Sequence, residues 1–302
     1  MKSAKILAYA KINLMLDVLR KREDGYHEVD MIMQNIDLAD EIFLQPASEI
    51  KIKCTETSIP EKDNLAYKAA DLLRTNYPEI LGAEIIINKK IPLQAGLAGG
   101  SADAAAVLRG LPLIYGLEPD QHRLLEMAAS LGSDVPFCLQ GPTSRAKGRG
   151  EMLESLPEPP TLHLVLVKPF FGVSTAAVYQ NCKLTKQMVH PDIEEYLRFL
   201  DRGDRESLIN KQKNVLEEST FELFPEIVGL KKEMLKLGAK QVLMSGSGPT
   251  LFATFEEEKN AAEYFARIKT KDAQVFLTKT VSEKTLEKRV MIFEKSQKIT
   301  AG

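Results

Sequence analysis

The sequence is poor in several features that would mark a particular class of protein. It has only three cysteines, Cys54, Cys138 and Cys182, whose wide spacing suits neither a disulfide framework nor a metal knuckle. No apolar run approaches the length of a membrane span, and no apolar core follows Met1-Lys2. We therefore expect no membrane segment and no secretory signal, and a cytoplasmic location.

The overall charge is small as well. The 302 residues carry a formal net charge of -2, and the sequence pI is about 6.2. These values argue against a nucleic-acid-binding or membrane-surface protein. Hydrophobic residues at 44% and charged residues at 27% are ordinary globular values, and the length allows two domains with substantial cores.

Hydrophobic periodicity predicts a mixture of strands and helices. Alternating apolar residues predict a first strand over 5–18. Further strands are expected over 28–36, 41–44, 50–54, 83–88, 162–167, 241–244 and 251–255. Helices are expected over 64–73, 101–115, 120–131, 193–200 and 224–237, with a break or a kink in the second near Gly110 and Pro112. Because several strands precede the first long helix, the pattern predicts an α+β fold.

Prolines suggest the domain boundary. Three of the four residues in 157–160 are proline, which fits neither a helix nor a central strand. We therefore predict one domain over 1–156 and a second over 161–281. Residues 282–302 are charged and irregular and are predicted to form a tail, whose order the sequence leaves open.

The segment 92–103, PLQAGLAGGSAD, is the most informative feature that is present. It lies between a strand of β-branched residues and an alanine-rich helix. Glycines allow backbone N–H groups to approach a phosphate, and a helix N-terminus adds unpaired donors. The alternative is a tight turn without a ligand. The segment lacks the lysine of a Walker loop, and its position does not suit a dinucleotide fingerprint, so a third kind of phosphate loop is needed.

Four other segments contain polar residues that a core would not need. Lys11 and Asn13 lie on the same face of the first strand, roughly 6–7 Å apart. Asp134 stands at a probable helix start, within 132–137. The turn at 172–175 and a second glycine loop at 244–250 complete the set.

Together these segments resemble the GHMP kinase superfamily, named for galactose, homoserine, mevalonate and phosphomevalonate kinases. The resemblance extends from about residue 5 to about residue 280 and rests on motifs in the family's order. They are AKINL at 10–14, DGYH at 24–27, the loop from Pro92 to Ser101, SDVPF at 133–137, GRGE at 148–151 and SGSGPT at 245–250. The resemblance implies a two-domain GHMP kinase fold. Its N-terminal nucleotide-binding domain would resemble a ribosomal protein, and its C-terminal domain would be an α/β sandwich.

The resemblance also implies ATP as phosphoryl donor, with Mg²⁺, and two catalytic residues. Asp134 would take the proton of the attacking hydroxyl, and Lys11 would offset charge nearby. The alternatives are a helix cap for Asp134 and an edge lysine for Lys11. No residue is assigned as a metal ligand. The residues implied in ATP binding are Pro92, Leu93, Gln94, Ala95, Gly96, Leu97, Ala98, Gly99, Gly100, Ser101, Ala102, Asn64 and Lys89.

For the second substrate, the resemblance implies a small molecule, a cytidine diphosphate-linked methylerythritol of the non-mevalonate isoprenoid pathway, phosphorylated on its 2-hydroxyl. A cytosine pocket needs aromatic rings and fixed polar groups. The substrate-binding residues would be Asn13, Tyr26, His27, Thr175 and Tyr179. The alternatives are a packing role for Tyr26, a surface role for His27 and a role in holding a strand end for Asn13. For Asn64 the alternative is a helix cap, and for Lys89 it is a solvated charge.

Three other functions compete with this interpretation. The chain could be another GHMP small-molecule kinase of mevalonate or homoserine type, a non-catalytic ligand sensor, or a nucleic-acid-binding module. Only 145–149, RAKGR, favours the last, against a net negative charge. Many family members have a second serine where this chain has Ala102, which leaves the handling of the metal open. The oligomeric state is also left open.

Overall fold

The larger of two sheets is built on one long hairpin. The computed structural model describes residues 2–55, 59–185 and 187–294. In it, β1 (Ser3–Lys21) and β2 (His27–Pro46) pair antiparallel along almost their whole length. β2 is one strand where two were predicted, at 28–36 and 41–44. In the predicted gap, Ala39 and Asp40 pair with Tyr9 and Ala8, and the register shift between Tyr9 and Lys11 accommodates 36–38.

The other strands of this sheet flank the hairpin. β4 pairs with the end of β2 and β5 with its beginning, while β3 pairs parallel with β4 and β6 pairs with β5. Their bounds are Ile50–Cys54 for β3, Ala83–Asn88 for β4, Thr143–Gly148 for β5 and Met152–Ser155 for β6. The two-residue β8 (Lys213–Asn214) comes from the second half of the chain and pairs parallel with β1 at Met15 and Leu16. β1 is thereby attached to both halves of the chain.

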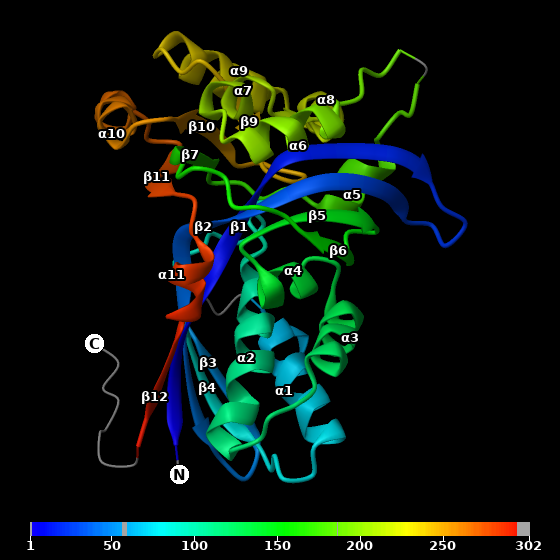
Figure 1. Ribbon diagram of the computed structural model, residues 1–302, viewed down its shortest axis with the longest axis vertical. Coiled ribbons are helices and arrows are strands. Elements are labelled where there is room, and N and C mark those ends of the chain that lie inside the picture. Colours follow the sequence, from blue (N-terminus) through cyan, green and yellow to red (C-terminus); the bar gives the residue numbers. More distant parts are fainter. Residues whose placement is uncertain (1, 56–58, 186, 295–302) are drawn as a thin grey trace.

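Helices cover one face of this sheet in the lower half of Figure 1. They are α1 (Leu65–Asn76), α2 (Gly99–Tyr115), α3 (Gln121–Leu131) and α4 (Val135–Gln140), preceded by the 3-10 helix η1 (Glu61–Asp63). Of the break or kink predicted in α2 near Gly110 and Pro112, the break is wrong, since the helix is continuous there. Gly110 serves packing instead, because a Cβ at this position would lie 2.0 Å from Ile6 Cδ1.

The second half of the chain forms a smaller antiparallel sheet with the strand order β11-β7-β10-β9 (Figure 1). Its strands are β7 (His163–Pro169), β9 (Val242–Met244), β10 (Leu251–Phe255) and β11 (Ala273–Lys279). The helices of this half are α5 (Thr175–Gln180), α6 (Ile193–Arg202), α7 (Arg205–Asn210), α8 (Leu216–Leu223), α9 (Pro225–Lys236) and α10 (Glu258–Arg267). The predicted α+β class with two sheet-containing halves is confirmed. In the part of the chain that is described, no helix is long and apolar enough to cross a membrane.

The segment expected to be a tail is partly built into the first sheet, which corrects that expectation. α11 (Glu283–Glu287) leads to β12 (Val290–Phe293), which pairs antiparallel with the start of β1. The physical reason is that Val-Met-Ile-Phe is an apolar run that can continue the sheet beside β1. The rest of the predicted tail, 295–302, lies outside the described residues.

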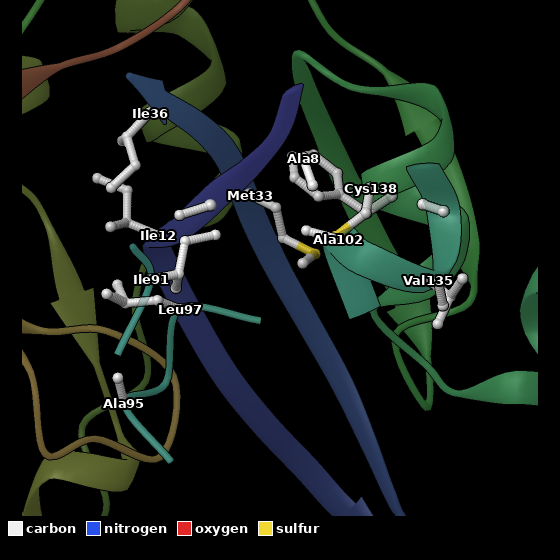
Figure 2. Close-up of a cluster of buried hydrophobic side chains, with 14 of the residues drawn as sticks. Ala8, Ile12, Met33, Ile36, Ile91, Ala95, Leu97, Ala102, Val135 and Cys138 are labelled. Carbon is white, nitrogen blue, oxygen red and sulfur yellow. The ribbon is translucent and has the colours of Figure 1, made fainter. Parts of the chain in front are cut away.

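One apolar core connects the sheet to the helices and loops around it. Ile12 and Met33 come from the central hairpin, and Ala102 comes from the first turn of α2. Ile91 and Leu97, on the loop before α2, belong to the same cluster (Figure 2). These buried side chains anchor the glycine loop against β1, and the backbone N–H of Lys11 donates to the carbonyl of Leu97 at 3.1 Å.

Candidate active site

A cavity of about 730 Å³ is lined by residues from both halves of the chain. The first half contributes side chains of β1 and β2, the glycine loop and the start of α4. The second half contributes α5 and the second glycine loop. The predicted site residues that line it are Lys11, Asn13, Tyr26, His27, Pro92, Leu93, Gln94, Ala95, Gly96, Ala98, Gly99, Gly100, Ser101, Asp134, Thr175 and Tyr179.

Lys11 and Asp134 meet in this cavity. The ammonium of Lys11 lies 3.5 Å from Asp134 Oδ2 and donates to Asn13 Oδ1 at 2.8 Å. The Lys11 side chain is only 5% exposed, so it does not act as a solvent-facing edge lysine. Asp134 stands at the N-cap position of α4, yet its side chain makes no capping hydrogen bond. Both structural alternatives considered from the sequence therefore lose their support.

The glycine loop enters α2 in a conformation suited to an anion. Ala98 has φ +57° and Gly96 has φ +74°, and α2 begins at Gly99. The N–H groups of a first helical turn have no intrahelical acceptor, so those of 99–101 can face a ligand. Leu97 and Ala102 do not line the cavity. The N–H of Ala102 donates to the carbonyl of Ala98 at 2.9 Å, and its methyl is in the core.

The second glycine loop lies directly against the first. Ser245 Oγ donates to the carbonyl of Gly96 at 2.9 Å. A Cβ on Gly96 would stand 2.2 Å from the carbonyl oxygen of Ser245, so only glycine allows this approach. Asn214 of β8 donates to the carbonyls of Met244 and Gly246, both at 2.8 Å. The relative position of the two loops is therefore fixed by direct contacts.

Aromatic side chains form the other end of the cavity. The rings of His27 and Tyr179 are 5.3 Å apart between centroids, at 36°. The guanidinium of Arg149 lies 5.0 Å from the ring of Tyr26, which is 54% exposed. Burial, with a smaller effect of Lys21, lowers the pKa of His27 below 6.5, so its ring is neutral at neutral pH. Burial also raises the pKa of Tyr179.

Two residues predicted to bind ATP lie outside the cavity lining. Asn64 caps α1, where its Oδ1 accepts from the N–H of Ala66 at 2.9 Å. Lys89 forms ion pairs with Asp40 and Asp103 beneath the glycine loop. Asn64 thus takes the capping role given as its alternative, whereas the solvated charge given as the alternative for Lys89 is wrong, because its side chain is only 5% exposed.

The structure adds cavity-lining residues that sequence reasoning missed. Lys21 and Arg149 line the aromatic end, and Gly246 and Ser247 of the second glycine loop also line the cavity, where Ser247 Oγ is 2.8 Å from Thr175 Oγ1. The motifs at 148–151 and 244–250 contained the signal for three of them, but no role was assigned to the individual residues. Lys21 is the last residue of β1, which extends beyond the strand predicted over 5–18.

Arg145, the first cation of the basic stretch 145–149, is not part of a free cationic surface. The guanidinium of Arg145 pairs with Asp30 at 2.7 Å and with Glu194 at 2.7 Å, and it is 11% exposed. Its charge is therefore neutralised within the protein. This geometry gives no support to the nucleic-acid interpretation.

The fold and the glycine loop before α2 point to a class, the GHMP kinases. A family model described as "GHMP kinases N terminal domain" matches residues 64–142, and "GHMP kinases C terminal" matches residues 193–273. With the full-length similarities that follow, the chain belongs to the GHMP kinase family.

The more particular similarity is to one kind of kinase. A protein of Bacillus cytotoxicus named 4-diphosphocytidyl-2-C-methyl-D-erythritol kinase is 46% identical over 286 residues, which are 93% of this chain and 99% of that protein. A protein of Acetivibrio thermocellus with the same name is 44% identical over 283 residues, 93% of this chain and 100% of that one. A crystal structure of 4-(cytidine 5'-diphospho)-2C-methyl-D-erythritol kinase superimposes with a TM-score of 0.79 at 34% identity, over 92% of this chain and 99% of that one.

Proposed function

We propose that this protein is an enzyme that phosphorylates the 2-hydroxyl of 4-diphosphocytidyl-2-C-methyl-D-erythritol with ATP, a step of the non-mevalonate isoprenoid pathway. The proposal is based on one observation: the Lys11–Asp134 ion pair lies in the same cavity as the glycine loop and the aromatic rings. The near full-length similarity to kinases named for this substrate supports the acceptor. We predict that the reaction takes place in the cytoplasm.

The phosphate end of the cavity suits ATP. The N–H groups at the start of α2 and the loop glycines would bind phosphate oxygens, and the helix N-terminus favours their negative charge. Among the described residues, no cluster of three or more His, Cys, Asp or Glu is placed to hold a metal. Mg²⁺ would bind largely through the phosphates of ATP, with the Ser101 hydroxyl as an oxygen donor that lines the cavity at the start of α2. It would supply positive charge that neutralises the phosphates.

Asp134 is placed to act as the base. Its carboxylate would accept the proton of the acceptor hydroxyl while that oxygen forms a bond to the γ-phosphorus of ATP. The bond from the γ-phosphorus to the bridging oxygen breaks, and ADP leaves. The ammonium of Lys11, held by Asn13 and adjacent to Asp134, would offset the negative charge at the reacting groups.

The aromatic end suits a cytidine nucleotide. A base could stack on Tyr26, His27 or Tyr179, and the neutral imidazole of His27 can both donate and accept a hydrogen bond. Arg149 and Lys21 line the same end and would attract the diphosphate. The cavity thus offers two cationic side chains at the end where the base would bind.

The decisive experiment is an assay of the purified protein with ATP, Mg²⁺ and 4-diphosphocytidyl-2-C-methyl-D-erythritol. We expect one ADP and one phosphorylated product per turnover, with the new phosphate on the 2-hydroxyl by NMR. Mevalonate and homoserine serve as control acceptors and are expected to be inert. Turnover of either control in place of the cytidyl compound would overturn the proposed acceptor, and no ADP with any acceptor would favour the sensor.

A further inference from the structure

A buried set of three charged residues lies beneath the phosphate loop. Lys89 follows β4, Asp40 lies on β2, and Asp103 lies in the first turns of α2. The Lys89 ammonium donates to Asp40 Oδ2 at 2.5 Å and to Asp103 Oδ2 at 2.8 Å. The three side chains are 5%, 0% and 4% exposed, respectively. Solvent therefore screens none of these charges.

Each member of the set holds a different part of the loop. Asp40 Oδ1 accepts from the backbone N–H groups of Lys90 and Ile91, at 2.5 and 2.8 Å, where the chain leads into the loop. Asp103 belongs to the helix on which the loop ends. Between them, Gly99 lies so close that a Cβ there would be 3.2 Å from Lys89 Nζ. The Lys89 ammonium thus lies directly against the end of the loop at Gly99.

Burying this combination of charges is not expected to stabilise the folded protein. Two carboxylates share one ammonium, and Asp103 Oδ1 is buried without a hydrogen-bond partner among the described residues. Burial, with a further effect of the neighbouring Asp40, raises the pKa of Asp103 against the effect of Lys89. The two carboxylates raise the pKa of Lys89 despite its own burial. Replacing such buried charges by apolar groups is often neutral or stabilising, so their presence calls for another role.

We propose that Asp40, Lys89 and Asp103 are positioning residues that fix the phosphate loop relative to β2 and α2, so that its N–H groups converge on the phosphates of ATP. In this assignment Lys89 acts through the loop and does not contact the adenine. The inference rests on the proposed function only in that the loop binds a nucleoside phosphate. It does not depend on which acceptor is phosphorylated.

The test compares Lys89→Met and Asp103→Asn with wild type in direct titrations with ADP and GDP, which need no acceptor. We expect the Kd for ADP to rise about tenfold in each variant, while the ratio of the GDP and ADP constants stays unchanged. In the full assay, KM for ATP should rise by a similar factor, and KM for the acceptor should stay within about twofold. If Lys89→Met does not fold, Asp103→Asn alone still tests the proposal.

Asp30→Asn provides a control, since it disrupts another poorly exposed ion pair of β2, with Arg145, away from the loop. It should lower the melting temperature without changing the Kd for ADP. The double variant Lys89→Met/Asp103→Asn should bind ADP about as well as either single variant, because both remove the same support.

Wild-type ADP binding in Lys89→Met and Asp103→Asn would overturn the proposal. So would a change of the GDP to ADP ratio in Lys89→Met alone, which would make Lys89 a base contact. A third contrary result is an equal loss of ADP binding in Asp30→Asn. It would show that Asp40, Lys89 and Asp103 affect binding only through the stability of the fold.

Discussion

The carboxylate of Asp134 lies 3.5 Å from the ammonium of Lys11 although Asp134 occupies the position from which a side chain usually caps its own helix. A capping hydrogen bond typically contributes about 1 kcal/mol, and α4 does without it. The carboxylate therefore makes no bond to the backbone of α4 and instead lines the cavity beside Lys11. This is the arrangement that a general base requires.

Replacement of Asp134 by Asn should abolish most of the turnover while leaving nucleotide binding intact. The amide has the same shape but cannot accept the proton, so we expect kcat to fall by about 10²–10⁴-fold. The measurement is steady-state ADP release, with ADP titration as the control for folding and binding. An unchanged kcat would show that another group takes the proton.

Loss of Arg149 should weaken binding of the cytidyl substrate without affecting ATP. Removing one charged contact to a diphosphate costs about 1.5–3 kcal/mol, so KM for the acceptor should rise at least tenfold in Arg149→Met. Arg20→Met is the matched control, because Arg20 is 70% exposed and does not line the cavity. Equal KM values in the two variants would remove Arg149 from the binding site.

Gly96→Ala should separate the two glycine loops. The new methyl would stand 2.2 Å from the carbonyl oxygen of Ser245, and φ is +74°. We expect a loss of about 2–4 kcal/mol in unfolding free energy and weaker ADP binding. Gly116→Ala has nearly the same φ, +73°, but open space around it, and should lose only about 1–2 kcal/mol. Similar losses in urea titrations would contradict the close approach.

His27 should make stability depend on pH in a defined direction. Because burial lowers its pKa in the folded protein, the unfolded chain binds the proton first as the pH falls through 6.5. Between about pH 7.5 and about pH 5.5, wild type should therefore lose more unfolding free energy than His27→Gln. Urea unfolding at both pH values measures the difference, and parallel losses would show that the pKa of His27 is not lowered.

The parts of the site that could be predicted from the sequence are those whose residues lie close together in the chain. The glycines before α2 and the Lys11–Asn13 pair on one strand face are of this kind. Asp134 was found through its motif, although its contact with Lys11 is a long-range relation. The roles assigned to these residues stay predictions until the assays above are done.

The partners of Lys89 could not be predicted in this way. Its local sequence looks like a solvated turn, and only the assembled sheet and helix bring Asp40 and Asp103 to it from distant positions. The strand at 290–293 could not be predicted either. Its charged neighbours in the sequence suggested a tail, but these residues pair with the free edge of β1. Long-range pairing decided both cases.

β8 also bears on how this protein can change in evolution. Asn214 joins the first sheet next to β1 and, through its side chain, holds the carbonyls of Met244 and Gly246. A chimera that exchanged the second half for that of a distant relative would have to preserve this asparagine, its pairing with Leu16 and the fit of Ser245 on Gly96 together. The two halves are therefore not interchangeable modules, and substrate preference should evolve by substitutions around the cavity rather than by recombination of halves.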